Sequence, residues 1–171
     1  MKDESRKTMT LGVVSDTHGF LDPKVFNVFS DVDLILHAGD IGHEDVITAL
    51  ETIAPVRAVH GNVDGFPLCE RYPAVYAEEL AGVVFCMVHE RVDPDSRVVT
   101  DALATVTTKP LDVLIYGHSH LARLERVGEV LLLNPGSAGR PRFSLRPAVA
   151  RITIEPDKPV AAEIIYLDRQ P

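Results

Sequence analysis

The sequence predicts a mixed α/β fold in which two β-sheets lie face to face and helices cover the outside. The first half alternates short apolar runs with helix-like segments, a pattern typical of parallel strands joined by helices. The second half contains pairs of apolar runs joined by short turns, which indicates antiparallel hairpins. With 171 residues, of which 46% are hydrophobic and 25% charged, the chain can bury a substantial core.

Three short runs rich in Val, Ile and Leu are predicted to be buried strands in the first half. They span residues 10–16, 33–40 and 55–62. The segment 22–30 is helix-like, with Asp22 as the expected N-cap and Pro23 at the first helical position. The segment 43–53 is also helix-like, because its apolar residues recur at helical spacing, at Val46, Ile47, Leu50 and Ile53.

The second half is predicted to be mainly antiparallel. Hairpins are expected at 74–90, 122–134 and 147–168. The first turns at an Ala-Gly pair, and the other two turn near Gly128 and Asp157. A helix is expected over 96–108, although β-branched residues lower its helical propensity. Residues 111–120 contain a further buried strand.

One domain is expected, because no repeat, low-complexity segment or Gly/Ser linker divides the chain. We assign it to residues 10–171. Residues 1–9 are expected to form a flexible tail, since they are polar and lack the apolar centre of a secretory signal.

Charge and composition exclude several classes of protein. A formal net charge of −8 argues against a general DNA or RNA binder, which needs positive charge. No apolar stretch approaches the roughly 20 residues that span a bilayer, so no membrane segment is expected. Cys69 and Cys86 form no CxxC pair, and Cys86 lies in an apolar run, where a buried thiol is expected. We therefore predict a cytoplasmic protein without disulfides.

The same few polar residue types follow five apolar runs, in the stretches "SDTHG", "HAGD", "HGN", "VHE" and "YGHSH". Ligands gather at the carboxyl ends of strands in α/β sheets, so these side chains are expected to converge. Residues two apart in an extended stretch point the same way, which would aim Asp16 with His18, and His118 with His120, at a common point. The predicted ligands are Asp16, His18, Asp40, Asn62, His89, His118 and His120.

These ligands offer nitrogen and oxygen donors and no thiolate. They are too many for one tetrahedral zinc ion, and they suit two metal ions of higher coordination that share a bridging ligand. Two divalent ions set against two carboxylates and one hydroxide leave a positive excess, which favours an anionic substrate. A hydroxide bridging two metals is an activated nucleophile at neutral pH. The sequence therefore predicts phosphoester hydrolysis.

The ordered pattern D-x-H, GD, GN, H and GHxH resembles the calcineurin-like metallophosphoesterase superfamily, over residues 11–137. The short chain and "NPGS" at 134–137 look most like its small bacterial and archaeal phosphodiesterase branch. The resemblance implies a four-layer α/β/β/α sandwich of two mixed sheets with a dinuclear metal centre. It suggests Mn²⁺ first, with Fe, Zn²⁺ or Ni²⁺ as alternatives. The resemblance implies one metal on Asp16, His18 and His120, another on Asn62, His89 and His118, and Asp40 as the bridge.

Two positions depart from the family pattern. Glu90 follows His89 where relatives usually have glycine, and its carboxylate could repel phosphate, add a ligand or turn into solvent. Related phosphatases often carry a histidine directly after the motif asparagine as a candidate acid for the leaving group. Here Val63 occupies that position and Asp64 follows, so the leaving-group acid stays unassigned.

Other polar residues have competing interpretations. Structural roles are expected for His37, His43 and His60. Asp16 as a phosphoaspartate nucleophile is disfavoured, because that chemistry needs a second acid where this chain has His18. The "NPGS" segment is either a simple turn or a loop that shapes the metal site. A basic loop carries residues that could bind phosphate or simply face solvent: Arg140, Arg142 and Arg146.

The predicted function is metal-dependent hydrolysis of a small phosphodiester or phosphomonoester, with the diester favoured. The alternative is a non-catalytic scaffold, because the retromer subunit resembles this fold and binds partner proteins without phosphoesterase activity. In the retromer subunit some of the ligand positions are altered. All seven positions are intact in this chain, which favours the enzyme. The sequence specifies neither the physiological substrate nor an oligomeric state.

Overall fold

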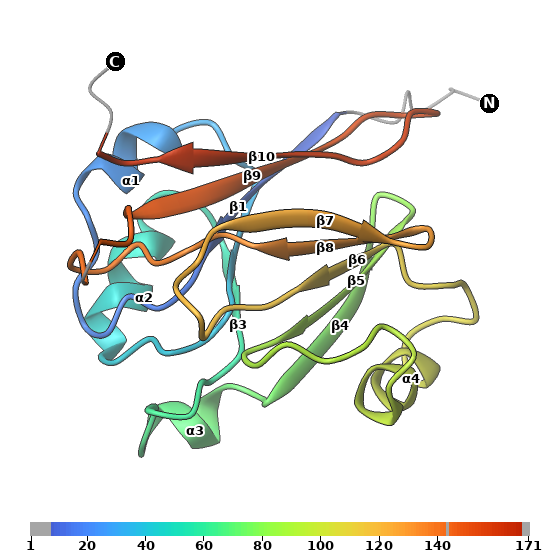
Figure 1. Cartoon of the computed structure of the whole chain (residues 1–171), viewed down its shortest axis with the longest axis horizontal. Coiled ribbons are helices and arrows are strands. Elements are labelled where there is room, and N and C mark those ends of the chain that lie inside the picture. Colours follow the sequence, from blue (N-terminus) through green and yellow to red (C-terminus); the bar gives the residue numbers. More distant parts are fainter. Residues whose placement is uncertain (1–7, 143, 169–171) are drawn as a thin grey trace.

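A computed structural model describes residues 8–142 and 144–168, and the described residues form two five-stranded sheets (Figure 1). In spatial order the first sheet contains β10 (Ala161–Tyr166), β9 (Ala148–Ile154), β1 (Met9–Val14), β2 (Leu34–His37) and β3 (Val56–Ala58). The second contains β4 (Val75–Leu80), β5 (Val83–Val88), β6 (Val113–Ile115), β8 (Val130–Asn134) and β7 (Arg123–Val127).

Both sheets mix parallel and antiparallel pairs. In the first, β1, β2 and β3 run parallel, and β9 and β10 join antiparallel on the far side of β1. In the second, β5, β6 and β8 run parallel, while β4 and β7 pair antiparallel at the two edges. The parallel strands of each sheet carry their carboxyl ends to one edge, where ligands gather in α/β proteins.

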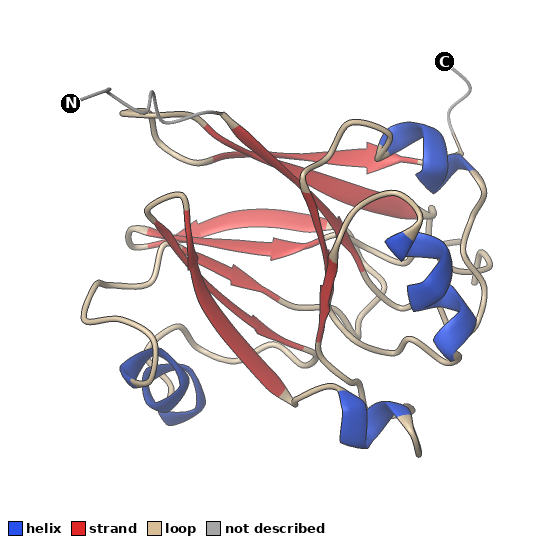
Figure 2. Cartoon of the chain, turned by 180° about the vertical axis from the view of Figure 1, so that it is seen from behind, coloured by secondary structure: helices blue, strands red, loops and turns tan. Residues whose placement is uncertain are grey.

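The described helices are α1 (Lys24–Val28), α2 (Glu44–Glu51), α3 (Leu68–Arg71) and α4 (Arg97–Ala104). Figure 2 shows α1 and α2 beside the first sheet and α4 beside the second, on opposite sides of the molecule. None of the helices in the described ranges is long and apolar enough to cross a membrane.

Three apolar clusters fill the spaces between these layers. The cluster between the sheets takes alternate residues from both, including Leu11 and Leu36 from one and Phe85 and Ile115 from the other. Residues that point the opposite way pack with the helices, as Ile35 does against α1 and α2 and Cys86 does against α4. The predicted four-layer α/β/β/α fold of two mixed sheets is confirmed.

Most of the expected elements are present, and the differences are local. The three hairpins turn where the sequence indicates, with positive φ at Ala81, Gly128 and Asp157. The first strand begins at Met9, inside the segment 1–9 that was predicted to be a flexible tail. Residues 1–7 of that segment lie outside the described residues. Burial raises the pKa of the Cys86 thiol to about 11, which fits its predicted place in the core.

The first helix begins one residue later than expected. Pro23 occupies the N-cap of α1, so the prediction of Asp22 at that position is wrong. The Asp22 carboxylate still accepts a hydrogen bond from the Lys24 N–H at 2.9 Å. One short helix, α3, carries no clear periodicity over its four residues and was not predicted.

Candidate metal centre

The seven predicted ligands all follow strands whose carboxyl ends meet between the two sheets. Asp16 and His18 follow β1, Asp40 follows β2, and Asn62 follows β3. His89 comes directly after β5 in the second sheet, and His118 and His120 follow β6. The parallel strands of both sheets therefore place these side chains at one site, as the sequence predicts.

The way in which these residues converge differs from the expected one. The strands end at Val14 and Ile115, before the paired motif residues, so strand alternation does not aim them. Five predicted ligands instead have left-handed backbone: Asp16 (φ 53°), His18 (47°), Asp40 (53°), His118 (68°) and His120 (59°). Non-glycine residues adopt this conformation at a cost, and such strain concentrates at functional sites.

One cluster that could hold a metal ion consists of Asp16, His18 and His120. The Nε2 atoms of the two histidines lie 3.1 Å apart, and His120 Nε2 is 3.3 Å from Asp16 Oδ1. Asp16 is fully buried, and its Oδ1 has no hydrogen-bond partner among the described residues. A buried carboxylate oxygen without a partner is costly, and a cation shared with the two imidazoles would satisfy it. These residues fit a metal ion.

The second cluster consists of Asp40, His89 and His118. His89 Nε2 lies 3.3 Å from Asp40 Oδ2. Asn62 completes this side, because its Oδ1 lies 3.1 Å from His89 Nε2 and 3.0 Å from His118 Nδ1. Asp40 Oδ2 also lies 3.8 Å from His18 Nε2 of the first cluster, so this carboxylate stands between the two.

A backbone carbonyl fixes which nitrogen of His89 can act as a ligand. Its Nδ1 lies 2.8 Å from the carbonyl oxygen of Ala38, which can only accept a hydrogen bond. Nδ1 therefore carries a proton in either charge state, and Nε2 can bind a metal ion once it is deprotonated. Histidines that bind metals in proteins commonly use such a second hydrogen bond to set their orientation.

The electrostatics of the centre favour a protonated His89 beside an ionised Asp40. Burial opposes protonation of His89, but its hydrogen bonds with Asp40 and the Ala38 carbonyl raise its pKa. Burial alone would raise the pKa of Asp40, and the hydrogen bonds from His89 and the Val63 N–H hold it below its usual value. Burial and the positive charge of Arg142 lower the pKa of His18, which favours the neutral imidazole that binds a metal.

Asp64 has a structural role that the sequence reading missed. It is buried, and its carboxylate accepts hydrogen bonds from the backbone N–H groups of Ile41, Gly42 and Gly61, at 3.1, 2.8 and 2.7 Å. This side chain joins the loop after β2 to the loop after β3. The one indication of this role in the sequence was its position two residues after the predicted ligand Asn62. Because these contacts occupy both oxygens, we assign Asp64 to loop positioning and leave the leaving-group acid unassigned.

The "NPGS" segment supports the site. Asn134 donates to the carbonyl of Gly117 at 2.8 Å, next to the two histidines that follow β6. The Ser137 hydroxyl donates to the backbone carbonyl of Asp16 at 2.8 Å. Of the two interpretations, the structure favours the loop that shapes the site, although Gly136 also makes a turn, with a φ of 82°.

The three remaining histidines lie outside both clusters. His37 is fully buried, and burial lowers its pKa to about 4. Its Nδ1 accepts a hydrogen bond from the Gly39 N–H, and its Nε2 lies 2.9 Å from the Thr17 hydroxyl. His43 caps α2 by accepting from the Asp45 N–H. His60 Nδ1 lies 3.3 Å from the carbonyl of Gly61.

Glu90 is exposed and belongs to neither cluster. Of the three possibilities raised by the sequence, the structure favours a carboxylate turned toward solvent. It lines a hollow of about 260 Å³ that begins at Asn62 and His89 and continues over Val75 and Val92. A second hollow, of about 220 Å³, borders His118 on the other side and is lined by Arg91, Tyr116 and Leu121. The centre therefore has open space on two sides.

Comparisons with known proteins identify the family of this chain. The family described as "Calcineurin-like phosphoesterase superfamily domain" matches residues 9–157. A probable metallophosphoesterase of Methanothermobacter thermautotrophicus is 39% identical over 163 residues, covering 92% of each chain. A phosphodiesterase of Methanocaldococcus jannaschii is 30% identical over 139 residues, covering 75% of this chain and 83% of that one.

Solved structures share the fold. A predicted phosphoesterase from Streptococcus pneumoniae superposes with a TM-score of 0.70 at 25% identity, covering 96% of this chain and 92% of that one. Vps29 of Chaetomium thermophilum superposes with a TM-score of 0.71 at 17% identity, covering 92% and 97% of the two chains. The second likeness, at so low an identity, concerns the fold alone.

Proposed function

The chain belongs to the calcineurin-like phosphoesterase superfamily, and on this premise we propose that it is a phosphodiesterase that uses two divalent metal ions. Asp16, His18 and His120 would hold one ion, and Asn62, His89 and His118 the other. Asp40, whose Oδ2 lies between His89 and His18, would contact both. When bound, the two ions would supply a shared hydroxide as nucleophile and would stabilise the charge that develops on the phosphate.

The observation that carries this proposal is the buried Asp16 carboxylate. Its Oδ1 has no hydrogen-bond partner among the described residues and lies 3.3 Å from Nε2 of His120. Its other oxygen accepts from the Ser15 hydroxyl and the His118 N–H, which holds the carboxylate in place. A fixed, buried acceptor beside imidazole nitrogens matches the donor set that Mn²⁺, Fe, Zn²⁺ and Ni²⁺ accept, and Mn²⁺ is our first choice.

The two hollows beside the centre support a diester as the substrate. A phosphodiester carries organic groups on two sides of phosphorus, and here one hollow adjoins Asn62 and His89 while the other adjoins His118. Four valines and Glu90 are among the residues that line the first, and the second contains the Tyr116 ring. The relative from Methanocaldococcus jannaschii that is named a phosphodiesterase gives independent support.

The non-catalytic scaffold has less support. All seven ligand positions are intact, and Glu90, the one departure close to them, is exposed and outside both clusters. The charge of an exposed carboxylate is screened by water and salt, so its effect on a bound anion is small. Glu90→Gly should therefore change turnover little.

Hydrolysis of bis(p-nitrophenyl) phosphate with added Mn²⁺ tests the proposal. The wild type should be active only with metal, and Asp40→Ala and His89→Ala should each lose about 100-fold or more. His43→Gln is the matched control, because this histidine lies outside both clusters and lines neither hollow. Metal-independent hydrolysis, or activity that survives both substitutions, would refute the proposal. Comparison with p-nitrophenyl phosphate under the same conditions separates diesterase from monoesterase activity.

A further inference from the structure

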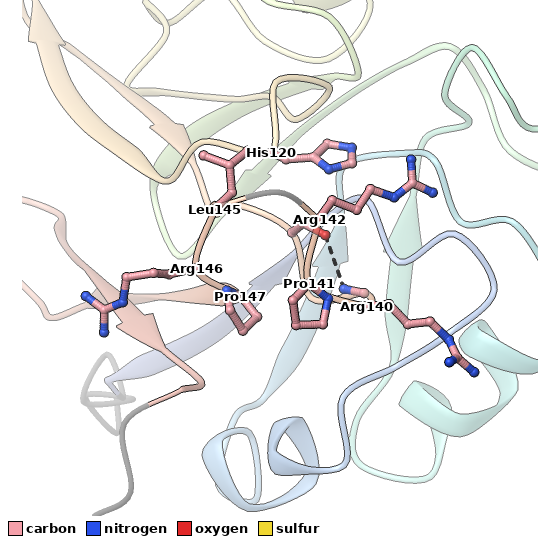
Figure 3. Close-up of a pocket in the computed structure, with 9 residues that line it drawn as sticks. His120, Arg140, Pro141, Arg142, Leu145, Arg146 and Pro147 are labelled. Carbon is pink, nitrogen blue, oxygen red and sulfur yellow. Dashed lines mark hydrogen bonds between the residues drawn. The ribbon is translucent and has the colours of Figure 1, made fainter.

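The loop that follows Ser137 brings three arginines to one side of the proposed metal centre. Arg140, Arg142 and Arg146 line a small pocket together with His120 (Figure 3). The start of this loop is fixed, because Ser137 donates to the carbonyl of Asp16 and the Ala138 N–H donates to the carbonyl of Ser15. The arginines therefore extend from a segment that is tied directly to the strand end carrying a predicted ligand.

Two of the three guanidinium groups already have structural partners. Arg146 donates twice to the Asp168 carboxylate, at 2.6 Å each, and stacks over the Tyr166 ring at 3.9 Å. Arg140 stacks over the ring of Phe20 at 4.9 Å. Figure 3 shows both side chains extending away from His120. These contacts engage both guanidinium groups away from the metal centre.

Arg142 differs from both. Within residues 8–142 and 144–168 its guanidinium makes no hydrogen bond, ion pair or ring contact, and the side chain is exposed. Figure 3 shows it extending alongside the imidazole of His120. A positive charge that no acid neutralises, held beside a site for cations, is unfavourable in the resting protein and becomes favourable when an anion binds.

We propose that Arg142 binds the phosphate group of the substrate, while Arg140 and Arg146 keep their contacts with Phe20, Tyr166 and Asp168. This inference rests on the proposed function. The planar guanidinium has a fork of N–H donors that matches two oxygens of one phosphate, and such charge-assisted pairs are among the stronger hydrogen bonds in proteins. Arg142 would then contact the non-bridging oxygens that face away from the metal ligands and fix the orientation of the ester.

Binding of inorganic phosphate to the Mn²⁺-loaded protein, measured by isothermal titration calorimetry, tests this role without requiring turnover. Arg142→Ala should weaken phosphate binding about tenfold or more, the range expected for a lost hydrogen bond to a charged group. Arg142→Lys should recover part of the loss, because a lysine keeps the charge but not the fork. Arg140→Ala, in the same loop, should change binding less than about threefold.

The kinetics of diester hydrolysis give a second readout. Arg142→Ala should lower kcat/KM by a similar factor while its bound Mn²⁺ and its melting temperature stay at the wild-type values. Phosphate affinity and kcat/KM that are unchanged in Arg142→Ala, or reduced equally in Arg140→Ala, would overturn the assignment. Failure of the wild type to hydrolyse any phosphoester would refute the proposed function, and the phosphate titration would still decide the role of Arg142.

Discussion

Gly61 lies directly against the carboxylate of Asp40. A Cβ atom added at Gly61 would fall well inside van der Waals contact with Asp40 Oδ1 and would meet Asp40 Cγ at 2.8 Å. The backbone of the loop after β3 is therefore in close contact with the carboxylate that lies between the two clusters. Because this contact leaves no room for a side chain, glycine in the GN motif is a steric requirement of the site.

Gly61→Ala should displace Asp40 and reduce metal-dependent hydrolysis about 100-fold, the cost that misplacement by an ångström can have at a reaction centre. Gly65→Ala is the matched control, because a Cβ atom there meets nothing within 4 Å. Kinetics of the two variants with bis(p-nitrophenyl) phosphate provide the measurement. Wild-type kcat/KM in Gly61→Ala would show that the position of Asp40 is not critical.

Asp64→Ala should destabilise the protein by about 3 kcal/mol, because three backbone N–H groups lose their acceptor. Urea unfolding in the presence of a chelator measures the effect without a contribution from bound metal. Asp33→Ala is the comparison, since its carboxylate accepts one exposed hydrogen bond, from the Thr10 N–H, and should cost at most about 1 kcal/mol. Equal losses in the two variants would contradict the role of Asp64 in joining the loops.

His37 should make the folded protein less stable in acid. Burial lowers its pKa from 6.5 to about 4, and the protonated ring could no longer accept from the Gly39 N–H. The unfolded chain takes up this proton near pH 6.5, so it binds more protons than the folded state between about pH 6.5 and 4. Stability therefore falls as the pH is lowered through this interval, by about 3 kcal/mol in total from this group.

Proton NMR titration of the histidine ring signals in the metal-free protein follows this group directly. The signals of His37 should keep their neutral shifts well below pH 6, and the decline in stability between pH 6.5 and 4 should be smaller in His37→Gln. A midpoint of His37 near 6.5 would contradict the explanation from burial.

Val98→Trp should change which diesters the protein accepts. Val98 lines the larger hollow and is 47% exposed, so a larger side chain can occupy that space without disturbing the core. We expect kcat/KM for bis(p-nitrophenyl) phosphate to fall about tenfold relative to methyl p-nitrophenyl phosphate, which carries one small group. Val106→Trp, at another exposed valine, should leave the ratio unchanged. An unchanged ratio in both variants would show that this hollow does not receive an ester group.

The sequence was informative where local pattern and topology act together. Short runs rich in Val and Leu predicted the parallel strands, and polar residues at their ends predicted the site, because parallel strands carry their carboxyl ends to one edge. The position of each predicted ligand after its strand follows from this rule. His37 could also be separated from the ligands, because it lies within a strand and not after it.

Features that depend on three-dimensional contacts were not accessible in this way. The left-handed backbone of Asp16 and His118 replaces the strand alternation that the spacing suggested. Asp and His are enriched in this conformation, but the preference is too weak to assign it to a given residue. The role of Asp64 depends on N–H groups in a loop more than twenty residues earlier in the chain. Whether Arg142 or its neighbours remain without a partner depends on Phe20 and Asp168, which lie far away in the sequence.

The number of metal ions bound per chain tests the central claim most directly. Protein saturated with Mn²⁺, freed of excess metal and measured by inductively coupled plasma mass spectrometry should contain about two ions per chain. His120→Ala and His118→Ala should each retain about one, since each removes a ligand from a different cluster. A wild-type protein that binds no metal at saturating supply, or variants with the wild-type content, would contradict the account.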